Sequence, residues 1–453
     1  MPAAKTRLGF AYWVVGSVVG AIHLALFARD LTQPDGFLRA DRARFRYHAM
    51  KNLIAAGHED YASFVACLVK QGIIGDYGIH AAFYAIGGAP AVIFVQVLLA
   101  IAAALCVVYI AWHTFLSRNL ALAAGLLYAV LPQSIAFPHQ LLSESIANPF
   151  LIFGTAAVVY GIQSQRKAPI WLLSGLAFGV AGLVRPALML LPLIAAVLLA
   201  WFGRGVANRK AALLAASGIA PFVLWCTFML LLTGRFGPGE STQDLGLNFS
   251  QSTAKVLLSE ADSLPPRLTV GQYLHYVARY PKGFANLYAK NIMVMVMDSG
   301  IGRLYVDLLG YGAKERQQLQ DPVIGWRAQL TNHGPLAMLQ SGWRLAPGTI
   351  IAGVLGAIGF AMVNIGTAFA YVILLRRGSP LGDPGTTLAI RWCVAFLLIV
   401  PLYVLATSEV VAYAPSRLRS QGEFAWAILA CFGWSRAWQL LRFRSVARGL
   451  NGA

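Results

Sequence analysis

Long apolar runs alternate with short polar segments along most of the chain. A membrane crossing needs about 20 consecutive, mainly apolar residues. The first run follows Lys5 and Arg7 and lacks a small-residue cleavage site after it, so we expect a retained helix and not a signal peptide. The pattern predicts an all-α polytopic membrane protein with about ten transmembrane helices, of which the third and fifth are short. The predicted crossings are 9–28, 91–115, 119–133, 141–163, 169–184, 187–203, 211–233, 347–375, 388–408 and 422–440.

Two longer polar stretches, 29–90 and 234–346, interrupt this pattern. Apolar residues recur at helical spacing in both, which predicts amphipathic surface helices in the first stretch and a small helical cap, broken at Pro281, in the second. We therefore divide the chain into a transmembrane module over 1–233 that includes the loop 29–90, a second loop over 234–346, and a transmembrane module over 347–453. The residues at helical spacing are Phe45, Ala49, Leu53, Tyr61, Phe64, Val65 and Leu68 in the first stretch, and Tyr273, Tyr276, Val277, Tyr280, Phe284, Leu287 and Tyr288 in the second.

The composition supports a membrane protein. Hydrophobic residues make up 58% of the 453 residues and charged residues only 12%, and the mean hydropathy is +0.63. These values exclude a disordered chain, a collagen-like chain and an ordinary soluble enzyme. The five cysteines show no metal-binding spacing and four of them lie in apolar runs, so no disulfide framework is expected.

The net charge of +18 is explained largely by membrane orientation. With the N-terminus inside, the inner segments contain a single acidic residue, Asp383, and many basic ones. Short cytoplasmic loops rich in Lys and Arg fix topology, so both termini are predicted in the cytoplasm, both long stretches outside, and no nucleic acid as a partner. The inner basic residues are Lys5, Arg7, Arg118, Arg166, Lys167, Arg204, Arg209, Lys210, Arg376, Arg377, Arg391, Arg436, Arg442, Arg444 and Arg448.

Several enzyme classes are excluded by missing motifs. The chain has no GxxxxGK[ST] or GxGxxG loop after a strand, no HExxH and no GxSxG. A polytopic protein without nucleotide-binding motifs either transports a molecule or acts on a membrane-borne substrate that already carries its own activation.

Acidic residues are scarce, and Asp41 has an unusual setting. It lies among Arg39, Arg42, Arg44 and Arg46, and nearby cations favour an ionised carboxylate. A carboxylate of this kind suits general-base chemistry on a hydroxyl. The alternative is a solvated helix face with loose ion pairs, each worth under about 1 kcal/mol.

Other charged residues lie at the outer ends of predicted crossings. Glu144 begins the fourth crossing and is either a functional acid or a carboxylate favoured by the helix dipole. Arg185 lies between two crossings and is either a ligand-binding or a snorkelling arginine. Arg417 and Arg419 precede Glu423, which could form a structural pair with one of them. Arginines at this depth suit a phosphate group.

Six segments, in chain order, carry a resemblance. They are 41–53 with an Asp followed by aromatic and alanine positions, 75–84 with His80 and Tyr84, Pro132 followed by 142–145 with Ser-Glu, 175–179 followed by Arg185-Pro186, 241–248 with Gly246-Leu247-Asn248, and 417–423 with Arg-x-Arg and Glu423. In these segments the chain resembles the polyprenyl-phosphate-sugar-dependent GT-C glycosyltransferases, which include protein O-mannosyltransferases and lipid A aminoarabinose transferases.

The chain departs from that family's pattern at several positions. Arg42 follows Asp41 where a second acid is common, Ala81 and Ala82 replace two prolines, and Gln421 replaces another. The missing second acid weakens a carboxylate-bound metal site, so no cofactor and no metal ligand are predicted, although a divalent ion stays open.

The resemblance implies an inverting transfer from a polyprenyl-phosphate sugar to a hydroxyl of a lipid, glycan or protein acceptor. It implies a bacterial inner-membrane enzyme with a periplasmic or extracellular site and Asp41 as the general base. Implied phosphate ligands are Arg185, Arg417, Arg419, Lys290 and Arg303, and implied sugar-binding, acceptor-binding or supporting residues are Glu144, His80, Tyr84, Asp76 and Glu423.

Other functions stay open at this point. A transporter or flippase for a lipid-linked sugar would share the spans and the basic cavity, but should place charges deep in several spans and show inverted repeats. A non-enzymatic partner protein would tolerate loss of Asp41, and a ligase would use a preassembled glycan donor. The sequence identifies neither the sugar nor the acceptor.

Overall fold

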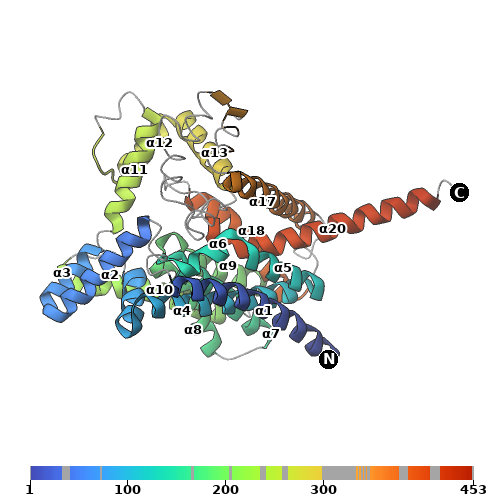
Figure 1. The fold of residues 1–453 in the computed structure, drawn as a ribbon, viewed down its shortest axis with the longest axis horizontal. Coiled ribbons are helices and arrows are strands. Elements are labelled where there is room, and N and C mark those ends of the chain that lie inside the picture. Colours follow the sequence, from blue (N-terminus) through green and yellow to red (C-terminus); the bar gives the residue numbers. More distant parts are fainter. Residues whose placement is uncertain are drawn as a thin grey trace.

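The computed structural model describes residues 2–32, 41–71, 74–164, 168–203, 207–234, 241–257, 264–297, 347–376, 386–408 and 419–450, with scattered positions between 333 and 343. Every regular element within these ranges is a helix, and most of the helices gather in one bundle (Figure 1). The predicted all-α polytopic membrane fold is therefore confirmed.

Seven segments in the described part of the chain are long and apolar enough to cross a membrane. They lie in α1 (Pro2–Thr32), α4 (Ile74–Phe115), α7 (Glu144–Gln163), α9 (Leu191–Gly203, extended by the short helix η3, Pro186–Leu188), α10 (Asn208–Thr233), α17 (Pro347–Leu374) and α18 (Leu388–Ser408). Each of these helices covers one of the predicted crossings.

The other three predicted crossings are also helical but less regular. α5 (Arg118–Val130) is followed by α6 (Pro132–Ala136) and η2 (Phe137–His139), and this pair, bent by 61°, counts as an eighth span if taken together. α8 (Ala168–Val184) is apolar but short. α20 (Glu423–Leu450) carries Arg436, Gln439 and Arg442 in its later part, which lowers its hydropathy. A crossing by α8 or α20 stays a prediction.

The first polar stretch forms α2 (Asp41–Glu59), α3 (Tyr61–Gln71) and the beginning of α4, as its helical spacing predicted. α2 and α3 lie at one side of the bundle (Figure 1). Met50 and Leu53 of α2 are buried with Val92 and Ile93 of α4, in a cluster that also contains Leu141. Burial of these side chains holds α2 beside the segment that leads to Glu144.

The second polar stretch contains α11 (Ser241–Leu257), α12 (Val270–Arg279) and α13 (Pro281–Met297). They share a small core of Phe249, Leu268, Tyr273 and Phe284. The predicted break at Pro281 is confirmed, because α12 ends at Arg279 and Pro281 begins α13, a position where its missing N–H costs nothing.

Several helix ends meet at one end of the bundle. His139 of η2 bonds to Asp30 near the C-terminal end of α1, and Arg185 after α8 pairs with Glu144 at the start of α7. Asn148 of α7 bonds to Ser420, just before α20. Glu144 and Arg185, two of the side chains that the sequence placed at outer helix ends, therefore lie together.

The glycines of the 175–179 segment let α8 and α10 approach closely. A Cβ at Gly175 would collide with the Ser217 side chain and the Leu214 carbonyl oxygen. A Cβ at Gly179 would lie 2.7 Å from the Gly218 carbonyl oxygen and 2.8 Å from Pro221. Small residues at such crossings allow backbones to pack directly in membrane helices. This contact fixes the end of α8, where Arg185 follows.

Substituting Gly175 should therefore weaken the bundle. Gly175→Ala is expected to lower stability by about 1–3 kcal/mol, because the added methyl group meets backbone that cannot move aside cheaply. Gly359→Ala on α17 is the matched control, since a Cβ there meets nothing within 4 Å. Thermal unfolding followed by tryptophan fluorescence compares the two, and equal midpoints would show that the close crossing is not needed.

Candidate functional site

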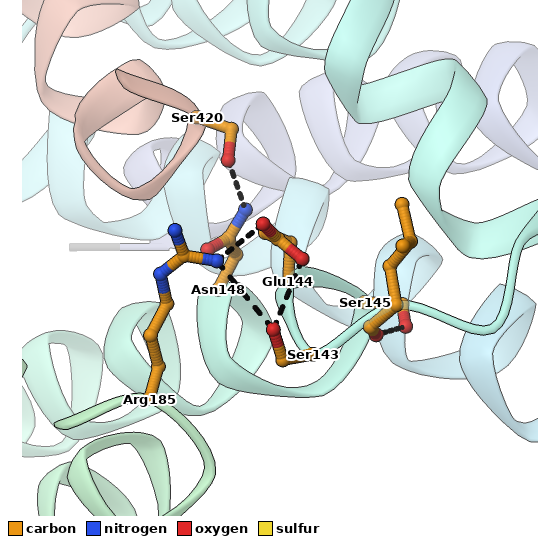
Figure 2. A network of polar contacts seen from close by, with 7 residues as sticks. Ser143, Glu144, Ser145, Asn148, Arg185 and Ser420 are labelled. Carbon is orange, nitrogen blue, oxygen red and sulfur yellow. Dashed lines mark hydrogen bonds and ion pairs between the residues drawn. The ribbon is translucent and has the colours of Figure 1, made fainter. Parts of the chain in front are cut away.

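The centre of the candidate site is an ion pair between Glu144 and Arg185. The Glu144 side chain is fully buried, whereas 11% of the Arg185 side chain is exposed. Ser143 Oγ donates to Glu144 Oε2 at 3.1 Å and accepts from Arg185 Nη1 at 3.5 Å (Figure 2). Three side chains therefore hold one another at the end of the bundle.

Local sequence explains how Arg185 reaches this position. Pro186 disfavours a helical conformation for the residue before it, and Arg185 has extended backbone angles of φ −139° and ψ 98°. α8 consequently ends at Val184. The following η3 turn begins with Pro186, and the arginine side chain crosses to α7.

A second ion pair joins Arg419 and Glu423, with 3.4 Å between Arg419 Nη2 and Glu423 Oε1. Both side chains are buried. Arg419 Nη1 also donates to the Met295 carbonyl oxygen at 2.7 Å, and its guanidinium lies 3.6 Å from the centre of the Phe360 ring. The structural Arg–Glu pair that the sequence allowed is thus present, and it ties α20 to α13 and α17.

Amide side chains add hydrogen bonds to each of the two ion pairs. With its amide oriented to suit its neighbours, Gln133 donates to Glu423 Oε1 at 2.7 Å and accepts from Arg419 Nη2 at 3.1 Å. Gln421 in the same way accepts from Arg185 Nη2 at 3.0 Å. We call the set Gln133, Ser143, Glu144, Asn148, Arg185, Arg419, Ser420, Gln421 and Glu423 the polar network.

The amides of this network were missed by sequence reasoning. Gln421 was noted only because it replaces a proline of the resembling family, and Gln133 and Asn148 were not singled out. The available signal was an amide inside an otherwise apolar helix, because a buried amide needs hydrogen-bond partners. Gln133 and Gln421 are both 2% exposed.

His80 supports the segment that carries Glu144. It is 2% exposed, and its Nε2 lies 2.8 Å from the Gln96 amide. With its amide turned to match the neighbours, Gln96 donates to the Pro138 carbonyl oxygen at 3.0 Å and accepts from Ser145 Oγ at 2.8 Å. This geometry favours a bracing role for His80 over direct contact with a phosphate.

The other predicted site residues lie apart from the network or outside the described side chains. Tyr84 Oη lies 3.3 Å from Tyr47 Oη on α2. Lys290 is exposed on α13, and no described contact joins it to the network. The side chains of Asp41 and Asp76, and residues Arg303 and Arg417 as a whole, fall outside the described part of the structure.

The position of α2 nevertheless restricts where the backbone of Asp41 can lie. α2 starts at Asp41, and its residues Met50 and Leu53 share a cluster with Leu141, while Leu183 packs against that cluster. Leu141 lies three residues before Glu144, and Leu183 lies two residues before Arg185. A helix rises about 1.5 Å per residue, so the backbone of Asp41 lies about 9 Å from that of Tyr47 along the helix axis.

The charges of the polar network balance, with two arginines against two glutamates. Burial of such groups is tolerated when each is paired and hydrogen-bonded. Arg185 is the charged member of the network whose side chain is partly exposed, at 11%, so an incoming anion would meet it first. Among the described residues, no group of three or more His, Cys, Asp or Glu side chains is arranged to hold a metal ion.

The bridging role of Gln133 gives a direct prediction. Gln133→Leu should remove a donor to Glu423 and an acceptor from Arg419 while keeping a similar volume, and so lower stability by about 1–3 kcal/mol. Chemical unfolding of the purified protein in detergent measures this loss. Gln163→Leu, near the other end of α7, is the control, since Gln163 accepts only an exposed bond from Tyr109 among the contacts described. A Gln133 variant as stable as this control would contradict the bridge.

Comparison with known proteins gives a family match within the N-terminal half of the chain. Residues 72–226 match the family model of dolichyl-phosphate-mannose-protein mannosyltransferases, a GT-C superfamily domain. The match covers about a third of the chain, and it includes His80, Glu144 and Arg185 but not Asp41 or Arg419. A comparison with curated proteins gave no match. The GT-C resemblance seen in the sequence is thereby confirmed.

Proposed function

We propose that this chain moves a sugar from a polyprenyl-phosphate donor to an acceptor hydroxyl. Residues 72–226 match a GT-C glycosyltransferase model of the mannosyltransferase type, which supports this activity. The hydroxyl attacks the anomeric carbon from the face opposite the phosphate, so the configuration inverts. The bond between the anomeric carbon and the phosphate oxygen breaks, and polyprenyl phosphate leaves with its electron pair.

The observation that carries this proposal is the position of Arg185. It lies within the matched segment, at the end of the bundle, and is held by Glu144 and Ser143 while part of its side chain stays exposed. Charge on the leaving phosphate increases in the transition state, so a fixed guanidinium stabilises that state more than the bound donor. We assign Arg185 as the principal phosphate ligand.

Glu144 and the second ion pair have supporting roles in this account. Glu144 is fully buried behind Arg185, and its carboxylate holds the guanidinium in one orientation. Arg419 is also fully buried, so it holds the start of α20 in place through Glu423 and Gln133. This differs from the direct phosphate contact that the sequence suggested for Arg419.

Asp41 is assigned as the general base. It would accept the proton of the acceptor hydroxyl as the new bond to the anomeric carbon forms. The packing of α2 supports this assignment, because Tyr47, Met50 and Leu53 of α2 share a cluster with Leu141 and Leu183, which lie just before Glu144 and Arg185 in sequence. The donor supplies its own activation, which agrees with the missing nucleotide-binding motifs.

The site is proposed on the outer face of a bacterial inner membrane. Basic residues gather at the helix ends opposite to the polar network, among them Arg118, Arg209 and Arg391. Cytoplasmic loops carry such an excess. The network would then open to the periplasm, where both lipid-linked donors and glycan or protein acceptors are available.

A transfer assay tests the proposal. Purified protein in lipid nanodiscs is supplied with polyprenyl-phosphate hexoses, aminosugars or uronic acids and with a membrane extract as acceptor source. The expected result is release of free polyprenyl phosphate in equal amount to the sugar transferred. A transporter would instead move the intact sugar lipid across the membrane of proteoliposomes without breaking the bond between sugar and phosphate. That outcome would contradict the proposed glycosyltransferase activity.

A further inference from the structure

A chain of three buried side chains lies beside the polar network. His139 Nδ1 lies 2.7 Å from Asp30 Oδ2, and His139 Nε2 lies 3.0 Å from His23 Nδ1. The three side chains are 0%, 7% and 2% exposed, in the order His139, Asp30 and His23. The two rings are nearly parallel, with 21° between their planes and 5.2 Å between their centres.

The carboxylate sets the direction of the hydrogen bonds along this chain. An ionised Asp30 can only accept, so His139 must carry its proton on Nδ1. The Nε2 of a neutral His139 then accepts from Nδ1–H of His23, which leaves Nε2 of His23 as an acceptor. Asp30 thereby determines which ring nitrogen of His23 donates and which accepts, although Asp30 reaches His23 only through His139.

His23 and Glu144 line the same small cavity. The cavity has a volume of about 20 Å3, and a water molecule needs about 10–15 Å3 by this measure. Its polar lining residues are His23, Tyr128, Gln133, Ser134, Glu144, Ser145 and Asn148. Asn148 Oδ1 is buried and has no partner among the described residues, so a polar acceptor is available to a water there. A water held in this cavity would lie between His23, at the end of the histidine chain, and Glu144, whose carboxylate holds Arg185.

A second connection runs along the backbone. His139 belongs to η2, and only four residues separate it from Glu144 at the start of α7. The Asp30–His139 bond anchors this segment to α1, and Gln96 anchors it to α4 through Pro138. The position of Glu144 thus depends on α1 in two ways.

We propose that Asp30, His139 and His23 form a positioning relay for Glu144, and that the relay fixes the orientation of Arg185 toward the donor phosphate. The last clause rests on the proposed function, whereas the linkage from Asp30 to Glu144 does not. None of the three residues contacts the donor in this account. They act by holding one hydrogen-bonding arrangement around the Glu144 carboxylate.

The linkage is tested without any enzymatic activity. Ring nitrogens of histidines are labelled with 15N, and the resonances of His23 and His139 are assigned by single substitutions. Glu144→Gln is expected to shift the His23 resonances through the shared cavity. Thr155→Val is the matched control, since Thr155 is buried on the same helix but bonds only to the Leu151 carbonyl oxygen among the described contacts. Unchanged His23 resonances in Glu144→Gln would overturn the relay.

Kinetics then test the positioning role. Asp30→Asn keeps the shape of the side chain but no longer fixes the His139 tautomer, and it should lower kcat about tenfold with the donor KM within about twofold of wild type, since small misplacement of reacting groups is costly. Its thermal midpoint should match that of Thr155→Val. The double variant Asp30→Asn/Glu144→Gln should be no slower than Glu144→Gln alone, because both changes break one linkage.

The outcomes separate the two proposals. The relay would be overturned if the double variant lost activity by the product of the two single-variant factors. It would also be overturned if the loss of kcat in Asp30→Asn were explained entirely by a smaller folded fraction. A wild-type protein that transfers no sugar from any polyprenyl phosphate would overturn the proposed function, while the 15N measurement would still decide the linkage.

Discussion

Asp41→Asn is expected to lower kcat by about 10²–10⁴-fold, the usual contribution of a general base. Asparagine keeps the shape of the side chain but cannot accept the proton of the acceptor hydroxyl. Donor binding should change little, because Arg185 is the proposed ligand of the donor phosphate. Transfer of radiolabelled sugar measures kcat, and binding of labelled polyprenyl phosphate measures the donor affinity.

The control for this substitution lies on the same helix. Glu59→Gln removes one negative charge from the exposed last residue of α2 and should leave kcat unchanged. Comparison of the two variants separates base catalysis from a general effect of charge in the loop. An Asp41→Asn protein with near-normal turnover would remove the base assignment.

Glu144→Ala is expected to destabilise the protein by about 3–5 kcal/mol, the cost of removing one partner of a buried ion pair. The substitution leaves the guanidinium of Arg185, with only 11% of its side chain exposed, without its carboxylate. The denaturant midpoint of the purified protein, followed by the fluorescence of its 11 tryptophans, measures the loss. Donor affinity should fall with it, because Arg185 loses its fixed orientation.

Glu144→Gln is the matched variant for this prediction. It removes the charge but keeps an oxygen that accepts from Arg185 and Ser143, so the expected loss is smaller, about 1–3 kcal/mol. Equal losses for Ala and Gln would show that packing, and not the ion pair, determines the stability of this segment. No loss in either variant would contradict the assigned role of Glu144.

The sequence predicted those parts of the molecule that depend on local patterns. Runs of apolar residues located the bundle helices, and Pro281 located the break between α12 and α13. Glu144 and Arg185 were identified because a charge at the end of an apolar run is rare and costly. For the same reason a structural pair between Glu423 and Arg417 or Arg419 was one of two interpretations, and the structure contains the pair of Arg419 and Glu423.

The remaining features depend on contacts between distant segments. Gln133 on α6 meets Arg419 and Glu423 only because the bend after α5 turns α6 toward the start of α20. His23 lay inside an apolar run, and nothing near it in sequence indicated His139 as a partner. The number of crossings also does not follow from local patterns alone, since α8 is short and α20 carries polar residues in its later part.

A structure with polyprenyl phosphate bound, determined by electron cryo-microscopy in nanodiscs, would show whether Arg185 binds the donor phosphate. We expect a phosphate oxygen about 2.7–2.9 Å from the Arg185 guanidinium, the distance of a charge-assisted hydrogen bond, with the Asp41 carboxylate facing the same space. A phosphate bound at the opposite end of the bundle, or an Asp41 side chain turned into bulk water away from Arg185, would contradict it.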